Sequence, residues 1–151
     1  MSRISQLVTQ SGADTFTSVA IETGLVVDGK SGWQINRISA YWVDASLVVA
    51  SDWWLAAIVS TDSAATTFGE EDEFGRLMWG MQNTAGVAVA VPFEPIKSID
   101  IFEPRVTVQP QIYCAVLSSI TGTANDIIFE IYYEAVKLTD LEVLRLLAGG
   151  A

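Results

Sequence analysis

Carboxylates are the side chains with which this sequence could do chemistry, because it contains no histidine and only one cysteine. Without histidine there is no Ser–His or Cys–His pair, and the commonest general base and metal ligand are missing. Glu130 and Glu134 fall on one face of an expected strand, but residues four apart on a strand are separated by about 13 Å. That separation exceeds both glycosidase geometries. We therefore expect no enzyme; a pair formed by one of these glutamates with a distant acid is the enzymatic alternative.

Two other segments have compositions that resemble ligand sites. The acidic stretch GEEDEFG at 69–75 offers oxygen ligands to Ca²⁺, but it lacks the spaced pattern of a known calcium loop. We expect it to be a solvated loop. GKSG at 29–32 lacks the long spacing of a phosphate loop and predicts a plain turn. No cofactor and no metal site are predicted.

Tryptophan is abundant, with five residues in a chain of 151. Trp53 and Trp54 are adjacent, and neighbouring residues on a strand point to opposite faces. We expect one of them to face the core and the other to meet a partner, so both are candidate interface residues. A stacking platform for sugars, built from exposed tryptophans, is the alternative.

The composition is more apolar than that of an ordinary soluble domain. Half of the residues are hydrophobic and 17% are charged, against the usual quarter. The most apolar window, 40–60, is interrupted by Asp44 and Asp52. Each would cost roughly 2.5–3.5 kcal/mol inside a membrane, so no membrane span is expected. The apolar surplus must be hidden in another way.

Net charge and cysteine content limit the kinds of partner and the cellular compartment that we expect. The net charge is −10, and the eight basic residues are scattered, whereas nucleic-acid binding relies on clustered cations. The single cysteine, Cys114, is expected to be a buried thiol that simply packs, which fits a reducing compartment. The first 16 residues contain one arginine and no continuous apolar run, so we expect no secretory signal and synthesis in a cytosol.

Alternation of apolar and polar residues predicts a β-rich fold. We expect one domain over residues 1–151 with about eight strands, of which 111–119 and 126–136 have the clearest pattern. Four prolines are expected to divide the second half into short pieces. An antiparallel β-sandwich is the predicted architecture, and a closed barrel is the alternative.

The last residues predict a helix over about 139–148. Thr139 and Glu142 have the spacing of a capping box, and Gly149 is placed to end the helix. So short a helix needs to dock an apolar face, and the residues expected to do so are Leu141, Leu144, Leu147 and Ala148. Docking on an open edge or end of the same sandwich and docking on a neighbouring subunit both fit the sequence.

The order of these elements resembles a known family. About eight strands, ending in PRVTVQPQIYCAVLSS and IIFEIYYEAVKL, look like the single jelly-roll coat proteins of small icosahedral viruses. The resemblance implies a wedge-shaped sandwich that tiles a shell, with synthesis in a host cytoplasm and a final location in the virion. One departure is the lack of a basic arm, because the amino terminus contains only Arg3. A shell lined by another protein or a membrane, or an outer decoration role, fits this departure better.

Assembly is therefore the leading hypothesis, since obligate interfaces absorb apolar surface that a monomer could not hide. We expect a structural subunit that self-assembles in many copies, together with other virion proteins if the resemblance holds, and that does not bind nucleic acid through a basic arm. The alternative is a carbohydrate- or ligand-binding β-sandwich that uses exposed tryptophans and acidic loops. The candidate interface residues are Leu141, Leu144, Leu147, Trp53 and Trp54.

Overall fold

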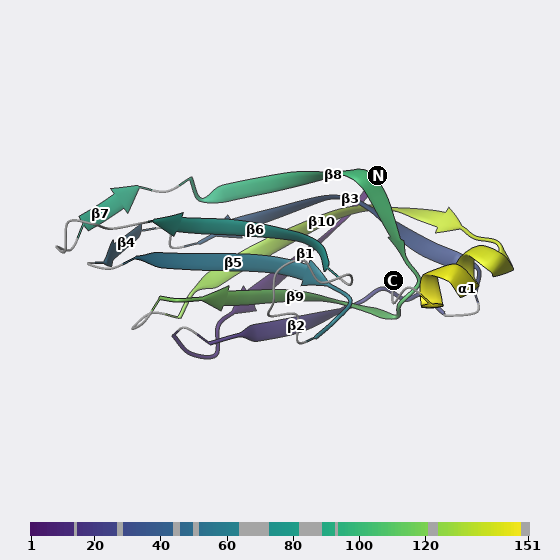
Figure 1. Ribbon diagram of the computed structural model, residues 1–151, viewed down its shortest axis with the longest axis horizontal. Helices are drawn as coiled ribbons and strands as arrows, with labels where there is room; N and C mark the ends of the chain where they lie inside the picture. Colours follow the sequence, from purple (N-terminus) through teal and green to yellow (C-terminus); the bar gives the residue numbers. More distant parts are fainter. Residues whose placement is uncertain are drawn as a thin grey trace.

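The computed structural model describes residues 1–13, 15–26, 29–43, 46–49, 52–63, 73–81, 89–92, 94–120 and 124–148. Within these ranges it contains ten strands and one helix (Figure 1). The strands are β1 (Ser2–Thr9), β2 (Thr17–Glu22), β3 (Ser31–Trp42), β4 (Ser46–Val49), β5 (Trp53–Ser60), β6 (Glu73–Met81), β7 (Val89–Pro92), β8 (Ile96–Thr107), β9 (Gln111–Ser118) and β10 (Asp126–Lys137). The helix is α1 (Asp140–Ala148).

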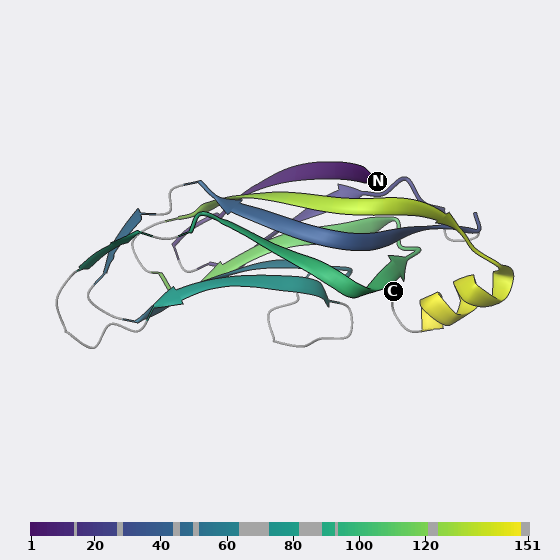
Figure 2. The same ribbon diagram turned by 90° about the horizontal axis from the view of Figure 1, so that it is seen from above.

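Eight of these strands form two antiparallel four-stranded sheets that face each other (Figure 2). Sheet A has the order β1-β10-β3-β8, and sheet B has the order β2-β9-β5-β6. β4 and β7 pair with each other at the end of the sandwich opposite to α1 (Figure 1). The predicted sandwich is confirmed, and the barrel alternative is wrong because the strands divide into separate sheets.

The strand pairs are nested in the sequence. β1 pairs with β10, β2 with β9, β3 with β8, β4 with β7, and β5 with β6. This is the pattern of one long hairpin, folded between β5 and β6 and then rolled so that β10 also meets β3 and β9 also meets β5. A hairpin rolled in this way into two facing sheets is a jelly roll.

Large apolar side chains fill the space between the two sheets. On β3, Ile38, Ala40 and Trp42 face inward and are almost fully buried, as the alternation along this strand predicts. On β10, Ile127, Phe129 and Ile131 fill the centre and have no exposed surface. From sheet B the core receives a third set: Trp53, Leu55, Ala57, Val59, Leu77, Trp79, Ile112, Cys114 and Val116.

A buried polar network lies at one edge of this core. The Oε1 atom of Gln10 accepts hydrogen bonds from the backbone N (3.0 Å) and from Nδ2 (2.9 Å) of Asn125. The indole Nε1 of Trp42 donates to Asn125 Oδ1 over 3.2 Å. These bonds satisfy polar groups that would otherwise destabilise the core.

The sequence analysis did not single out one strand, and one of its expectations about strands was wrong. The strand that it did not single out is β1 (SRISQLVT), which pairs with β10 over its whole length. The prolines were expected to divide the second half into short pieces, but β8 is a strand of 12 residues that runs through Pro104. The pairing of β8 with β3 shifts register between Ile35 and Arg37. Proline is tolerated at such an irregularity, where the ladder is already interrupted.

Some other expectations concern residues that the structure does not describe, and others can be compared with the described residues. Residues 69–72 of the acidic stretch and Gly149 lie outside the described residues. GKSG was expected to be a turn, and its first two residues form one: the backbone N of Gly29 donates to Val26 O over 2.8 Å, and Lys30 has a φ of 52°. Ser31 and Gly32 already belong to β3. In the described parts of the chain, no helix is long and apolar enough to cross a bilayer.

Candidate interaction surfaces

Four of the five tryptophans belong to the core and not to a surface. Trp42 makes edge-on contacts with Trp53 and Trp79, with ring centroids 5.7 and 5.8 Å apart, and Trp33 stacks on Tyr133 at 3.8 Å. All four indoles are less than 10% exposed. A sugar platform built from these residues is therefore wrong.

Of the adjacent pair, Trp53 faces the core and Trp54 faces outward, as strand alternation predicts. Trp53 is 3% exposed and Trp54 is 37% exposed. Trp54 lies on the outer side of sheet B and is held by two hydrogen bonds to Ser119: its backbone N donates to Ser119 Oγ (2.9 Å) and its carbonyl accepts from Ser119 N (3.0 Å). Only Trp54 of this pair offers an indole to a partner.

The outer face of sheet A carries a continuous line of apolar side chains, which we call the apolar row. Its members come from four adjacent strands in direct register: Leu7 on β1, Ile128 on β10, Tyr41 on β3 and Ile96 on β8. Leu7 and Ile96 are 52% and 54% exposed, and Tyr41 is 38% exposed. Sequence reasoning missed this feature, because the row exists only once four strands are in register.

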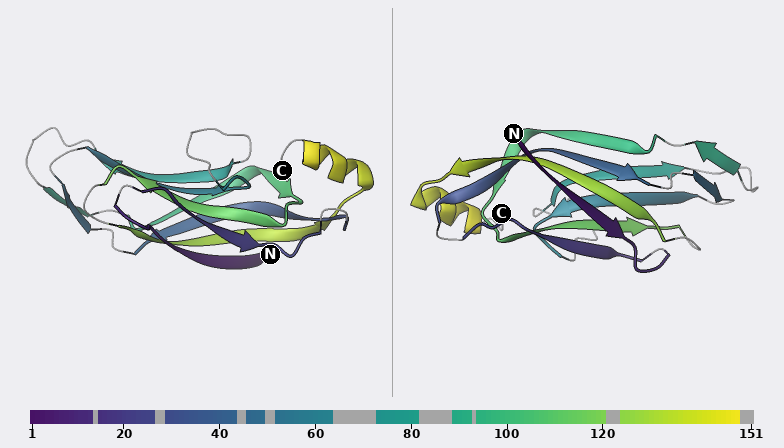
Figure 3. Two further views of the ribbon diagram at one scale, coloured as in Figure 1. Left: turned by 90° about the horizontal axis from the view of Figure 1, so that it is seen from below. Right: turned by 180° about the vertical axis from the view of Figure 1, so that it is seen from behind.

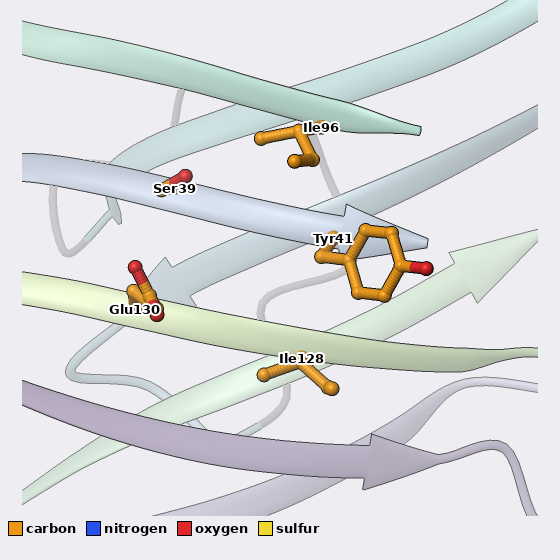
Figure 4. Close-up of a pocket in the computed structure, with 5 residues that line it drawn as sticks. All are labelled: Ser39, Tyr41, Ile96, Ile128 and Glu130. Atoms are coloured by element: carbon orange, nitrogen blue, oxygen red, sulfur yellow. The ribbon is translucent and has the colours of Figure 1, made fainter. Parts of the chain in front are cut away.

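A shallow depression of about 250 Å³ lies along this row (Figure 4). One end of it is lined by Ile128, Tyr41 and Ile96. The other end is lined by Ser39 and Glu130, which pair with each other two residues along the strands from Tyr41 and Ile128. The depression therefore combines an apolar half with a carboxylate.

Glu130 is fixed in place by its neighbours on sheet A. The Tyr132 hydroxyl donates to Glu130 Oε2 over 2.9 Å, and Arg3 Nη1 lies 3.5 Å from Oε1. Further along the same sheet, Arg37 Nε lies 3.5 Å from Asp100 Oδ1. These pairs are largely exposed to solvent, so each contributes little to stability. They orient the carboxylate of Glu130 and leave a third of its side-chain surface exposed.

The acidic and thiol side chains of the described residues form no metal centre. No group of three or more Cys, Asp or Glu side chains is placed to hold a metal ion there. Glu73, the described acid of the 69–75 stretch, lies in β6 and is largely enclosed in a bidentate pair with Arg76, with Nε–Oε1 and Nη2–Oε2 distances of 3.1 and 3.0 Å. The expectation of a solvated loop is therefore wrong for residues 73–75. Cys114 is buried, and the loss of hydration raises the pKa of its thiol far above the ordinary value. As expected, this thiol packs in the core.

Helix α1 begins with the predicted capping box. The backbone N of Thr139 donates to Glu142 Oε2 over 2.7 Å, and the backbone N of Glu142 donates to Thr139 Oγ1 over 3.3 Å. The hydrogen bond from the backbone N of Thr139 is the largest cause that lowers the pKa of the Glu142 carboxyl below its ordinary value of 4.5, and the Thr139 side chain lowers this pKa further. Lys30 Nζ lies 3.3 Å from Asp140 Oδ1 at the same end.

The helix docks on its own subunit by a face other than the expected one. Val143 is 7% exposed, and Leu146 is half-buried beside a cleft of about 240 Å³ that Val106 and Leu138 also line. Leu141 and Leu144, which were expected to dock, are 56% and 64% exposed. Leu147 is half-buried. The helix therefore has a docked side and, on its outward side, an apolar stripe formed by Leu141, Leu144 and Ala148.

Comparisons with known proteins give a distant likeness among solved structures. No protein-family model matches the sequence, and no curated protein matches it. Among solved structures, a chain in the structure of infectious bursal disease virus Gx strain is similar, with 15% sequence identity and a TM-score of 0.27. The match covers 94% of the present chain and 34% of that chain, so the present chain spans about a third of the viral chain's length. At this identity and TM-score, the likeness assigns no family.

Proposed function

We propose that this protein is a structural subunit that assembles in many copies into a shell, as a virus capsid protein or a capsid-associated protein. The observation that carries the proposal is the apolar row, together with the stripe on α1. Leu7, Ile96 and Leu144 each expose more than half of their surface, and large contiguous apolar patches mark interaction sites in soluble proteins. The jelly roll is also a fold that capsid domains use, although folds alone do not determine function.

The chemistry of the surface supports the same proposal. The described carboxylates are engaged in ion pairs or lie apart, and Arg3 belongs to a strand of sheet A and pairs with Glu130. We therefore infer that the protein is not an enzyme and does not bind a genome through a basic arm. Other virion proteins are the further partners that this role implies, and the virion is the location that it implies.

Gel filtration followed by negative-stain imaging tests this function. The proposal predicts that the purified protein elutes as discrete assemblies, and that images show rings or closed particles of uniform size. Uniform monomers at every concentration would contradict it.

A ligand-binding module is the second candidate, and the depression in Figure 4 favours it, because an aromatic ring there lies near a carboxylate and a hydroxyl. Four buried tryptophans weigh against the sugar platform first expected for such a module. This candidate predicts a stable monomer whose tryptophan fluorescence shifts on titration with glycans or Ca²⁺. The shell subunit predicts assembly without either addition.

A further inference from the structure

We propose that α1 of one copy docks through its apolar stripe on the apolar row of a second copy, so that subunits join head to tail. This inference rests on the proposed function and names the contact by which the subunits would assemble.

The helix cannot reach the row of its own subunit. It is tethered at the start of β3, where the backbone N of Leu138 donates to Lys30 O over 2.8 Å. Gly32 allows this approach, because a Cβ atom there would lie 3.1 Å from Leu138 Cδ1 and 2.7 Å from Val106 Cγ1. The apolar row crosses β3 at Tyr41, about 30 Å further along the strand at the ordinary rise per residue. The helix with its stripe and the apolar row therefore lie at opposite ends of sheet A (Figure 3).

The stripe is short enough to fit on the row. Leu141, Leu144 and Ala148 span about 10 Å of helix at 1.5 Å per residue. The four residues of the row lie on four adjacent strands and span about 14 Å at the usual strand spacing. A helix laid across the strands therefore places its whole stripe on the row.

The charges beside the two surfaces are complementary. Arg145 is exposed, follows Leu141 by four residues and also lines the cleft beside Leu146, so it lies between the docked side of the helix and the stripe. Glu130 lies on the flank of the row, in the same depression as Ile128. For a chain with a net charge of −10, association of copies requires a local attraction of this kind, and an arginine facing a carboxylate provides it.

A contact between two different patches has a consequence for assembly. When two copies do not make the contact reciprocally, it is heterologous and continues from copy to copy until a rotation closes a ring or an open chain forms. The proposed contact therefore supplies the repeated join that a shell built from one kind of subunit needs.

Two single variants and their mixture test the contact. Leu144→Asp disrupts the stripe on the helix, and Ile96→Asp disrupts the apolar row. Val26→Asp is the control, because it changes a third exposed apolar residue (64% exposed) outside both surfaces. Light scattering should show monomers for the first two variants and assemblies as for the wild type for Val26→Asp. An equimolar mixture of the first two should form dimers and nothing larger. In each dimer, the intact stripe of Ile96→Asp docks on the intact row of Leu144→Asp, and no second contact can form.

The alternatives give different results. Assembly by Ile96→Asp alone would indicate a helix-to-helix contact, assembly by Leu144→Asp alone would indicate a row-to-row contact, and a mixture that stays monomeric would also overturn the inference. Urea unfolding verifies that each variant folds, and Leu144→Gln and Ile96→Gln replace an aspartate variant that does not. Arg145→Glu should weaken association about tenfold, the equivalent of one charge pair, whereas Arg145→Lys should retain it. If the wild type itself never assembles, the proposed function fails; if it assembles and the variants do so equally, only this contact fails.

Discussion

Adjacent residues of α1 should have opposite effects on stability and assembly. Val143 is 7% exposed and Leu144 is 64% exposed. Val143→Ala removes two methyl groups from a buried site, which should cost about 1.5 kcal/mol at roughly 0.8 kcal/mol per buried group. The higher helix propensity of alanine offsets up to about 0.6 kcal/mol of that, so the net loss in the free energy of docking should be about 1 kcal/mol. Leu144→Ala should change stability by less than about 0.5 kcal/mol, as is usual for surface positions.

The assay for this prediction combines urea unfolding with amide exchange in α1. Both should be measured at low protein concentration, because association would itself raise the apparent stability. Val143→Ala should accelerate exchange in the helix, while Leu144→Ala should leave it close to that of the wild type. At high concentration the order should reverse, and Leu144→Ala should weaken association. If Leu144→Ala destabilised the monomer as much as Val143→Ala, the docked face of α1 would have been assigned incorrectly.

Three further perturbations follow from the packing and the cap. Gly32→Ala should destabilise the fold by about 1–3 kcal/mol in urea unfolding because of overpacking, since a Cβ atom there would lie 2.7 Å from a neighbouring side chain. The matched variant Gly80→Ala should be less destabilising, because the nearest atom to its Cβ would be 3.3 Å away. Phe129→Ala should cost about 3–5 kcal/mol, as for a fully buried ring, and a smaller loss would contradict its place in the core. Because hydrogen bonds to Thr139 lower the pKa of Glu142, the cap should stabilise α1 above pH 4.5 and lose this contribution as the pH falls through the lowered pKa. Amide exchange in α1 should show this loss, and Glu142→Gln, which removes the titrating carboxyl, should remove this pH dependence. Thr139→Ala should cost about 0.5–2 kcal/mol but retain part of the pH dependence, because its backbone N still donates to Glu142.

Local signals predicted the parts of the fold that depend on nearby residues. The capping box between Thr139 and Glu142 formed as expected because both partners lie within one turn. The inward side chains of β9 and β10 followed from alternation alone. The orientation of α1 did not, because the sequence offers apolar residues on more than one side of the helix and only the tertiary structure selects Val143.

The candidate interface was harder to predict, because it depends on pairing between distant strands. Leu7 and Tyr41 look like ordinary strand residues in the sequence, and β1 itself is too polar to be recognised from its pattern. Only the register that joins β1, β10, β3 and β8 brings their outward apolar side chains into one row. A surface platform was only the alternative for the five tryptophans, and hydrophobic burial placed four of them in the core.

The molar mass of the wild-type protein in solution tests the central claim most directly. Light scattering coupled to gel filtration, repeated over rising protein concentration, should give masses that are multiples of 16.3 kDa and that increase with concentration as exposed apolar rows become covered by other copies. A mass that stays at 16.3 kDa over the whole range would contradict the claim that copies of this chain cover one another's apolar surfaces.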